Sequence, residues 1–239
     1  MTYSNFTKPV WRWFYSEAKE KVRAKTQPNS LLPGFTWVDG RQTGDGRELV
    51  ASYQQFIAAF PWHVRLCNMN PLDTHDIPRF KTYALDGSQK VAAAMQFTFP
   101  GIPVIWAGDE FGLDGFNGEH SRSPLPWNGE LPTDKTLIKA YAELAKVRKE
   151  NSALNDGSMR FVYASAEAIV YVRENGKQTI VVAVTRGEDK NIKLPKDAVP
   201  GLAKAENIFG KGKIKLVDGK LHLPGDKLTA NVWRLRATK

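Results

Sequence analysis

The stretch Leu72-Asp73-Thr74-His75-Asp76-Ile77-Pro78-Arg79-Phe80 places a His-Asp pair after an apolar run, 63–70, that reads as a β-strand. A second run follows in Gly101-Ile102-Pro103-Val104-Ile105-Trp106-Ala107-Gly108-Asp109-Glu110-Phe111-Gly112, and it also leads into carboxylates. Residues 101–107 have the short, continuous apolar character of a buried strand in a parallel sheet. A segment with helical spacing separates the two runs. Together they predict parallel βα units with polar side chains at the strand ends.

Apolar residues at spacings of three and four predict helices around these strands. Thr7 is the expected N-cap of the first helix, and Pro9 lies in its first turn. Pro61 ends the second helix, and Asp86-Gly87-Ser88-Gln89 has the spacing of a capping box. The predicted segments are helices at 7–25, 49–60, 86–99 and 137–148 and a loop at 27–46.

After Gly157 the pattern changes to β-rich runs. Asn175-Gly176 and Asp218-Gly219 lie between strand-like segments, which is a strong signal for β-hairpins. The tail 230–236 alternates apolar and polar residues. These features predict an antiparallel β-sandwich over residues 158–239, after an α/β part at residues 1–157.

The net charge of +9 is carried almost entirely by the second part. Residues 1–158 hold 18 Lys/Arg and 17 Asp/Glu, whereas residues 159–239 hold 16 and 8. Such a bias is compatible with a nucleic-acid surface. The lysines are scattered rather than gathered in one block, so an ordinary solvated face is the favoured interpretation.

The single cysteine, Cys67, has no partner for an internal disulfide and is expected to be a buried, inert thiol. No run approaches the ~20 apolar residues that span a bilayer. The first residues lack a basic region followed by an apolar one, so no signal peptide is expected. The sequence therefore predicts a cytoplasmic protein with no membrane partner.

Asp76 is the strongest candidate for a catalytic residue, because the catalytic residues of parallel βα barrels lie at the C-terminal ends of their strands. A carboxylate there can stabilise positive charge on a sugar ring. Taken alone, Asp76 is more often a cap or turn residue. The sequence lacks phosphate- or dinucleotide-binding glycine motifs, zinc-ligand spacing and a serine elbow, so neither cofactor nor metal is expected. Most of the seven tryptophans are expected in the core.

Thr74–Phe80 resembles the fourth conserved region of the α-amylase family, glycoside hydrolase family 13. By this resemblance Asp76 is the third catalytic carboxylate, the stabiliser of the transition state, and His75 is a substrate ligand. Arg79 matches a common arginine of this segment. For Arg79, direct substrate contact and an ion pair that supports the loop remain equal alternatives.

Other segments resemble the same family in the same order. Gly101–Gly112 is similar to its eighth strand and following loop, where Asp109 and Glu110 are expected to be mainly structural. Glu119–Trp127 is similar to its Arg-x-Pro-Met-x-Trp segment, and Met1–Trp11 to the stretch after strand six. The resemblance implies an α/β plus β fold: the C-terminal part of a (β/α)8 TIM barrel, then the β-sandwich.

A retaining glycosidase needs a nucleophile and an acid/base about 5 Å apart. In the family resembled, these are an Asp after strand four and a Glu after strand five, and both would precede Met1. The resemblance thus implies the C-terminal fragment of a glycosidase acting on α-glucosides or maltooligosaccharides, inactive alone. We expect it to associate with itself or with the missing half of the barrel. The alternatives are a non-catalytic sugar-binding or interaction module, and a nucleic-acid partner using the basic half.

Overall fold

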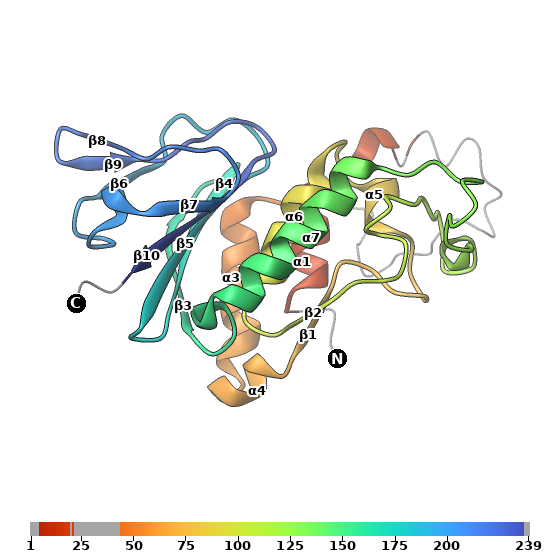
Figure 1. The fold of residues 1–239 in the computed structure, drawn as a ribbon, viewed down its shortest axis with the longest axis horizontal. Coiled ribbons are helices and arrows are strands. Elements are labelled where there is room, and N and C mark those ends of the chain that lie inside the picture. Colours follow the sequence, from red (N-terminus) through yellow and green to blue (C-terminus); the bar gives the residue numbers. More distant parts are fainter. Residues whose placement is uncertain (1–4, 20, 22–43, 237–239) are drawn as a thin grey trace.

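The computed structural model describes residues 5–19, 21 and 44–236. Figure 1 shows a layer of helices with antiparallel sheets on one side and long loops on the other. The elements of the first part are α1 (Thr7–Phe14), α3 (Gly46–Ala58), α4 (Trp62–Leu66), β1 (Met69–Pro71), α5 (Phe80–Tyr83), α6 (Ser88–Thr98), β2 (Ile102–Val104), the 3₁₀ turns η2 (His120–Arg122) and η3 (Ser152–Leu154), and α7 (Lys135–Glu150).

Strands β1 and β2 form a parallel pair connected through α5 and α6, as the alternation of strand and helix predicts. Met69 pairs with Ile102, and Pro71 with Val104. In the described residues this sheet has two strands, so it is no closed barrel. The second strand was expected to be buried, and this is wrong: Ile102 is 46% exposed and Ile105 39%. A parallel strand is buried when neighbours cover both faces, and β2 has β1 alone beside it.

The N-terminal helix differs from its prediction at both ends. Its N-cap is Phe6, while Thr7 lies inside the helix and donates from Oγ1 to the Pro71 carbonyl at 2.7 Å. A tertiary acceptor on β1 has therefore replaced the local cap. The helix ends at Phe14 because Tyr15 turns extended and pairs with Ala84. Most of the predicted loop at 27–46 lies outside the described residues.

The segment predicted as strand 63–70 is a strand only from Met69. Before it, α4 occupies Trp62–Leu66, where the Arg65 guanidinium lies 5.7 Å from the Trp62 ring centroid. These residues are three apart, and a helix brings such pairs together. Cys67 follows α4 and is exposed, so the expectation of a buried thiol is wrong.

Helix α6 is the central element of the first part, with nearly every side chain buried. The predicted capping box is absent, because Gly87 takes the N-cap position with φ of +82° and offers no side-chain oxygen. Alanines in the middle of α6 allow α7 and the C-terminal sheet to approach closely. Between them, Tyr171 OH lies 2.5 Å from Thr98 Oγ1.

The second part is antiparallel, as predicted. Its larger sheet has the order β3-β4-β5-β10-β7, and a smaller one the order β6-β9-β8. The strands are β3 (Ser158–Ala164), β4 (Ala168–Glu174), β5 (Gln178–Thr185), β6 (Lys193–Pro195), β7 (Glu206–Phe209), β8 (Lys215–Val217), β9 (Lys220–His222) and β10 (Ala230–Arg236), with the turn η4 at Leu202–Lys204. Both predicted hairpins are confirmed, and Asp218 and Gly219 have positive φ values of 48° and 71°.

Alternation along β4 and β5 divides the buried side chains between two cores. Tyr171 and Val182 face the helices, whereas Val172 and Val181 face the smaller sheet. The first core contains residues of α6 and of the larger sheet, so it extends across residues 157/158. The division into two domains at this position stays a prediction. Of the helices in the described part of the chain, none is long and apolar enough to cross a bilayer.

Candidate functional site

The His-Asp pair lies in the turn that follows β1. Thr74 begins this turn: its carbonyl accepts from the Ile77 amide at 3.3 Å, and its Oγ1 accepts from the Asp76 amide at 3.4 Å. The two side chains project outward, with 57% of His75 and 61% of Asp76 exposed. His75 Nε2 lies 3.1 Å from Asp76 Oδ1. The turn thus presents an imidazole and a carboxylate side by side at the C-terminal end of a parallel strand.

Arg122, from η2, completes this exposed group. Its Nη2 lies 3.6 Å from Asp76 Oδ1, and its Nε donates to the His75 carbonyl at 3.1 Å. Glu119 contacts the same guanidinium at 3.6 Å. Gly118 makes this approach possible, since a Cβ there would lie 3.0 Å from the Asp76 carbonyl oxygen. The loop after β2 therefore positions Arg122 against the turn after β1.

Beneath this group lies a buried ion pair. Arg79 and Asp109 are each 1% exposed, and Arg79 Nη1 donates to Asp109 Oδ1 at 2.9 Å. Arg79 Nη2 also donates to the carbonyls of Ala107 and Ser121, both at 2.8 Å. One guanidinium thus joins the turn after β1 to two points of the loop after β2. The ion pair of Arg79 with Asp109 is thus present in the structure, and substrate contact by Arg79 stays a prediction.

Asp73 is the second buried carboxyl group. Its Oδ2 accepts from the Phe80 amide at 2.6 Å, and Asp109 is close enough to influence its pKa. Burial raises the pKa of Asp73 to about 6. Burial, and then the neighbouring Asp73, raise the pKa of Asp109 as well. Two carboxyl groups that face one guanidinium reach neutrality by retaining one proton, so we infer a proton shared between them.

Trp106 connects the buried pair to the exposed one. The Arg79 guanidinium carbon lies 5.8 Å from the Trp106 ring centroid, and the His75 ring lies 5.9 Å from it on an inclined plane. The indole Nε1 donates to the Ser121 carbonyl at 3.2 Å. The His75 imidazole therefore packs against an indole that is itself fixed by the Ser121 carbonyl and the Arg79 guanidinium.

Among the described residues, no cluster of three or more His, Cys, Asp or Glu could hold a metal ion.

Comparison with known proteins gives this arrangement its context. The chain is 33% identical over 184 residues to a cyclomaltodextrinase from a Bacillus species, a match that covers 73% of this chain and 32% of that enzyme. It is 32% identical over 240 residues to neopullulanase 2 of Thermoactinomyces vulgaris, covering 85% of this chain and 41% of the relative. The chain belongs to the α-amylase family. No protein-family model matches it.

Solved structures agree at the level of the fold. The debranching enzyme from Nostoc punctiforme superimposes with a TM-score of 0.78 at 18% identity, over 98% of this chain and 47% of that one. That enzyme has also been crystallised with an acarbose soak. This α-amylase-family chain thus spans about a third to a half of the length of the relatives that it matches.

Within this family member, the roles of Asp76 and His75 as catalytic and substrate-binding groups stay predictions. The structure brings the two side chains together and places Arg79 below them rather than beside them. Arg122 and Asp73 are site residues that the sequence argument did not single out. For Arg122 a signal existed, since it is the arginine of the Arg-x-Pro-Met-x-Trp-like segment. For Asp73 the sequence held no such signal, because the burial of Asp73 depends on the loop after β2.

Proposed function

We propose that this chain is the C-terminal part of a retaining glycosidase that acts on α-glucosides or maltooligosaccharides. The observation that carries the proposal is the exposed pair of His75 and Asp76 at the C-terminal end of β1, with Arg122 against it. The names of the relatives, a cyclomaltodextrinase and a neopullulanase, support the substrate class.

In the proposed mechanism, Asp76 stabilises the oxocarbenium-like transition state. A fixed carboxylate near the anomeric carbon attracts the positive charge that develops as the glycosidic bond breaks. Arg122 and His75 both contact Asp76 Oδ1 and thereby orient the carboxyl group. His75 is the proposed hydrogen-bond partner of the sugar, held in place by Trp106.

The same proposal requires groups that this chain does not supply. A retaining glycosidase uses a nucleophilic carboxylate and an acid/base carboxylate about 5 Å apart. We assign both to the segment of the protein that holds the remaining strands of the barrel. The chain of 239 residues alone is therefore proposed to have little or no turnover.

The test compares this chain with a longer product that includes the upstream coding sequence. We expect hydrolysis of a chromogenic maltoside from the longer product only. In that product, Asp76→Asn should lower kcat by about 10²–10³-fold, as expected when transition-state stabilisation is lost. Asp218→Asn, which removes a carboxylate from an exposed turn, is the matched control and should leave kcat unchanged.

Three results would contradict parts of this proposal. Hydrolysis by the short chain that Asp76→Asn abolishes would show that no further segment is needed. Full activity of Asp76→Asn in the longer product would remove the role of Asp76. Saturable maltooligosaccharide binding without turnover in both products would instead support the non-catalytic module.

A further inference from the structure

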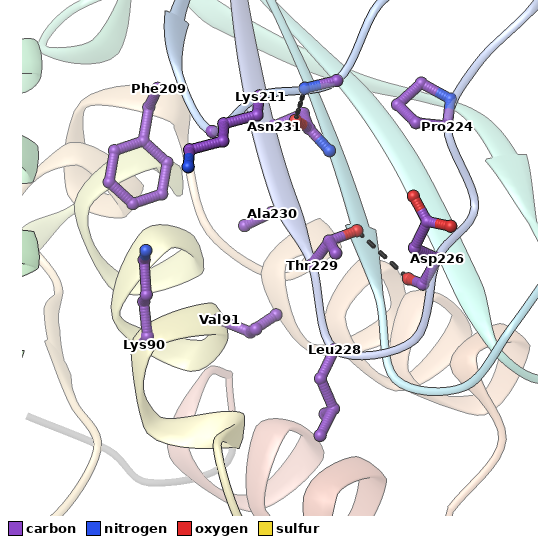
Figure 2. Close-up of a pocket in the computed structure, with 12 residues that line it drawn as sticks. Lys90, Val91, Phe209, Lys211, Pro224, Asp226, Leu228, Thr229, Ala230 and Asn231 are labelled. Atoms are coloured by element: carbon purple, nitrogen blue, oxygen red, sulfur yellow. Dashed lines mark hydrogen bonds between the residues drawn. The ribbon is translucent and has the colours of Figure 1, made fainter. Parts of the chain in front are cut away.

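A pocket that contains neither His75 nor Asp76 lies where the first turn of α6 meets the C-terminal sheets (Figure 2). It has a volume of about 290 Å³. Its walls come from α6, from the loop between β7 and β8, and from the segment that leads into β10. The proposed glycosidase function does not use this pocket.

One end of the pocket is positively charged. Lys90 reaches it from α6 and Lys211 from the loop Phe209-Gly210-Lys211-Gly212, and Figure 2 shows both ammonium groups beside the Phe209 ring. Lys90 Nζ lies 5.6 Å from the centroid of that ring. Neither lysine has an ion-pair partner within the described part of the chain. Two unneutralised ammonium groups at one end of a pocket favour an anionic ligand group.

The loop that carries Lys211 is held firmly. The Gly212 amide donates to Asn231 Oδ1 at 2.6 Å, and the Gly212 carbonyl accepts from Trp233 Nε1 at 3.3 Å. At Gly210, whose φ is +83°, a Cβ would lie 2.4 Å from the Ala230 carbonyl oxygen, so the loop is pressed against β10. The backbone at Lys211 is therefore fixed before any ligand binds, which lowers the entropic cost of ordering the loop.

Asn231 supplies a polar group in the wall. The residue is 3% exposed, and because its Oδ1 faces Gly212, its amide nitrogen points the other way, on the side where Thr229 lies (Figure 2). That nitrogen has no acceptor among the described residues. An amide donor in the pocket wall that no acceptor of the described residues occupies favours a ligand that carries oxygen atoms.

The opposite end of the pocket is acidic. The Asp226 carboxylate stands there beside Pro224, across the pocket from the two lysines (Figure 2). A carboxylate in this place accepts hydrogen bonds from hydroxyl groups and repels a second anionic group. The pocket thus suits a ligand with an anion at one end and hydroxyl groups at the other.

We propose that this pocket binds a monosaccharide phosphate, with the phosphate between Lys90 and Lys211 and the hydroxyl groups at Asn231 and Asp226. Lysine is a common point-charge partner of phosphate. A neutral sugar that stacks on an aromatic ring fits less well, because Phe209 is only 5% exposed and Lys90 lies over its ring. The proposal is independent of the glycosidase function.

The test is calorimetric titration of the full chain with glucose 6-phosphate, glucose and inorganic phosphate at low ionic strength. We expect saturable binding of glucose 6-phosphate and none of glucose. The double variant Lys90→Gln/Lys211→Gln should weaken glucose 6-phosphate binding about tenfold or more, since two charge-assisted contacts are lost. Both lysines are exposed, so the variant should fold.

The matched control is Lys215→Gln/Lys220→Gln, which removes the same charge from the exposed hairpin of β8 and β9. It should leave the affinity within about twofold, because these lysines lie outside the pocket. Asp226→Asn should weaken glucose 6-phosphate binding relative to that of inorganic phosphate. No saturable binding, equal losses in the two double variants, or equal affinity for glucose would overturn the proposal. Inorganic phosphate binding as tightly as glucose 6-phosphate would overturn its sugar half.

Discussion

At the scale of single residues, the balance of charge beneath the candidate site determines how the buried carboxyl groups bind protons. Asp73 and Asp109 are buried beside one guanidinium, that of Arg79. One oxygen of each carboxyl group, Asp73 Oδ1 and Asp109 Oδ2, has no donor among the residues that the structure describes. A proton shared between the two groups gives these oxygens a hydrogen bond and makes the cluster neutral. The sequence alone did not indicate this arrangement.

The cluster should make stability depend on pH. Because burial raises the pKa of Asp73 to about 6, the folded protein binds more protons than the unfolded chain between about pH 4 and 6. The contribution of Asp73 to the free energy of unfolding is therefore fully present below about pH 4 and is lost as the pH rises through about 6. We expect Asp73→Asn to remove a slope of at most about 1.4 kcal/mol per pH unit in that range. Urea unfolding at several pH values measures it.

Asp134 provides a control with the opposite sign. Its hydrogen bond from the Thr136 side chain, the main cause, keeps the pKa of Asp134 below its usual range. It therefore stabilises the fold above the unfolded pKa, and this contribution is lost as the pH falls. Asp134→Asn should reduce the loss of stability in acid. If Asp73→Asn changed the pH profile in the same direction, the shared proton would be refuted.

At the scale of secondary-structure elements, the C-terminal end of α6 joins the two parts of the chain. Arg148 of α7 donates to the Phe97 carbonyl at 2.8 Å, and Arg173 of β4 donates to the Thr98 carbonyl at 2.6 Å. The last carbonyls of a helix lack partners within it, and the negative end of the helix dipole favours cations. Arg173 is fully buried, and burial lowers its pKa to about 10.

Arg173→Met should therefore destabilise the fold by about 1–3 kcal/mol, because it leaves buried carbonyl groups without donors. Arg160→Met is the matched control: the Arg160 side chain is 42% exposed and its guanidinium pairs with Glu174 at the surface. Such pairs contribute less than about 1 kcal/mol. For each variant, the shift of its urea unfolding midpoint from that of the unchanged chain measures the loss of stability. Equal losses in the two variants would show that the link between α6 and β4 adds nothing to stability.

At the scale of the whole molecule, three exposed apolar residues lie on or directly after the parallel pair of strands. Met69 is 43% exposed, and Ile102 and Ile105 are 46% and 39% exposed. Within the described residues, this two-stranded sheet has no further strand on either edge. Unpaired edges with apolar side chains promote association. The relatives are two to three times longer than this chain.

The isolated chain should thus associate with itself through this sheet. Size-exclusion chromatography with light scattering should show species larger than the 26.8 kDa monomer. Ile102→Lys/Ile105→Lys should shift the population toward monomer, because charges on an edge strand oppose pairing. Leu216→Lys, at an exposed apolar residue of β8, is the control and should change nothing. A compact monomer of the unchanged chain at all concentrations would contradict the prediction.

Features that depend on neighbouring residues could be predicted from the amino-acid sequence. Period-two alternation and the dipeptides Asn175-Gly176 and Asp218-Gly219 predicted the antiparallel strands and their hairpins, and Thr74–Phe80 indicated the family. The remaining features depend on long-range packing. Thr7 bonds to β1 instead of capping its helix, and Arg79 is buried by the loop after β2. Arg122 meets Asp76 because two distant loops pack together. Such contacts join residues far apart in the chain, so only the packed molecule can specify them.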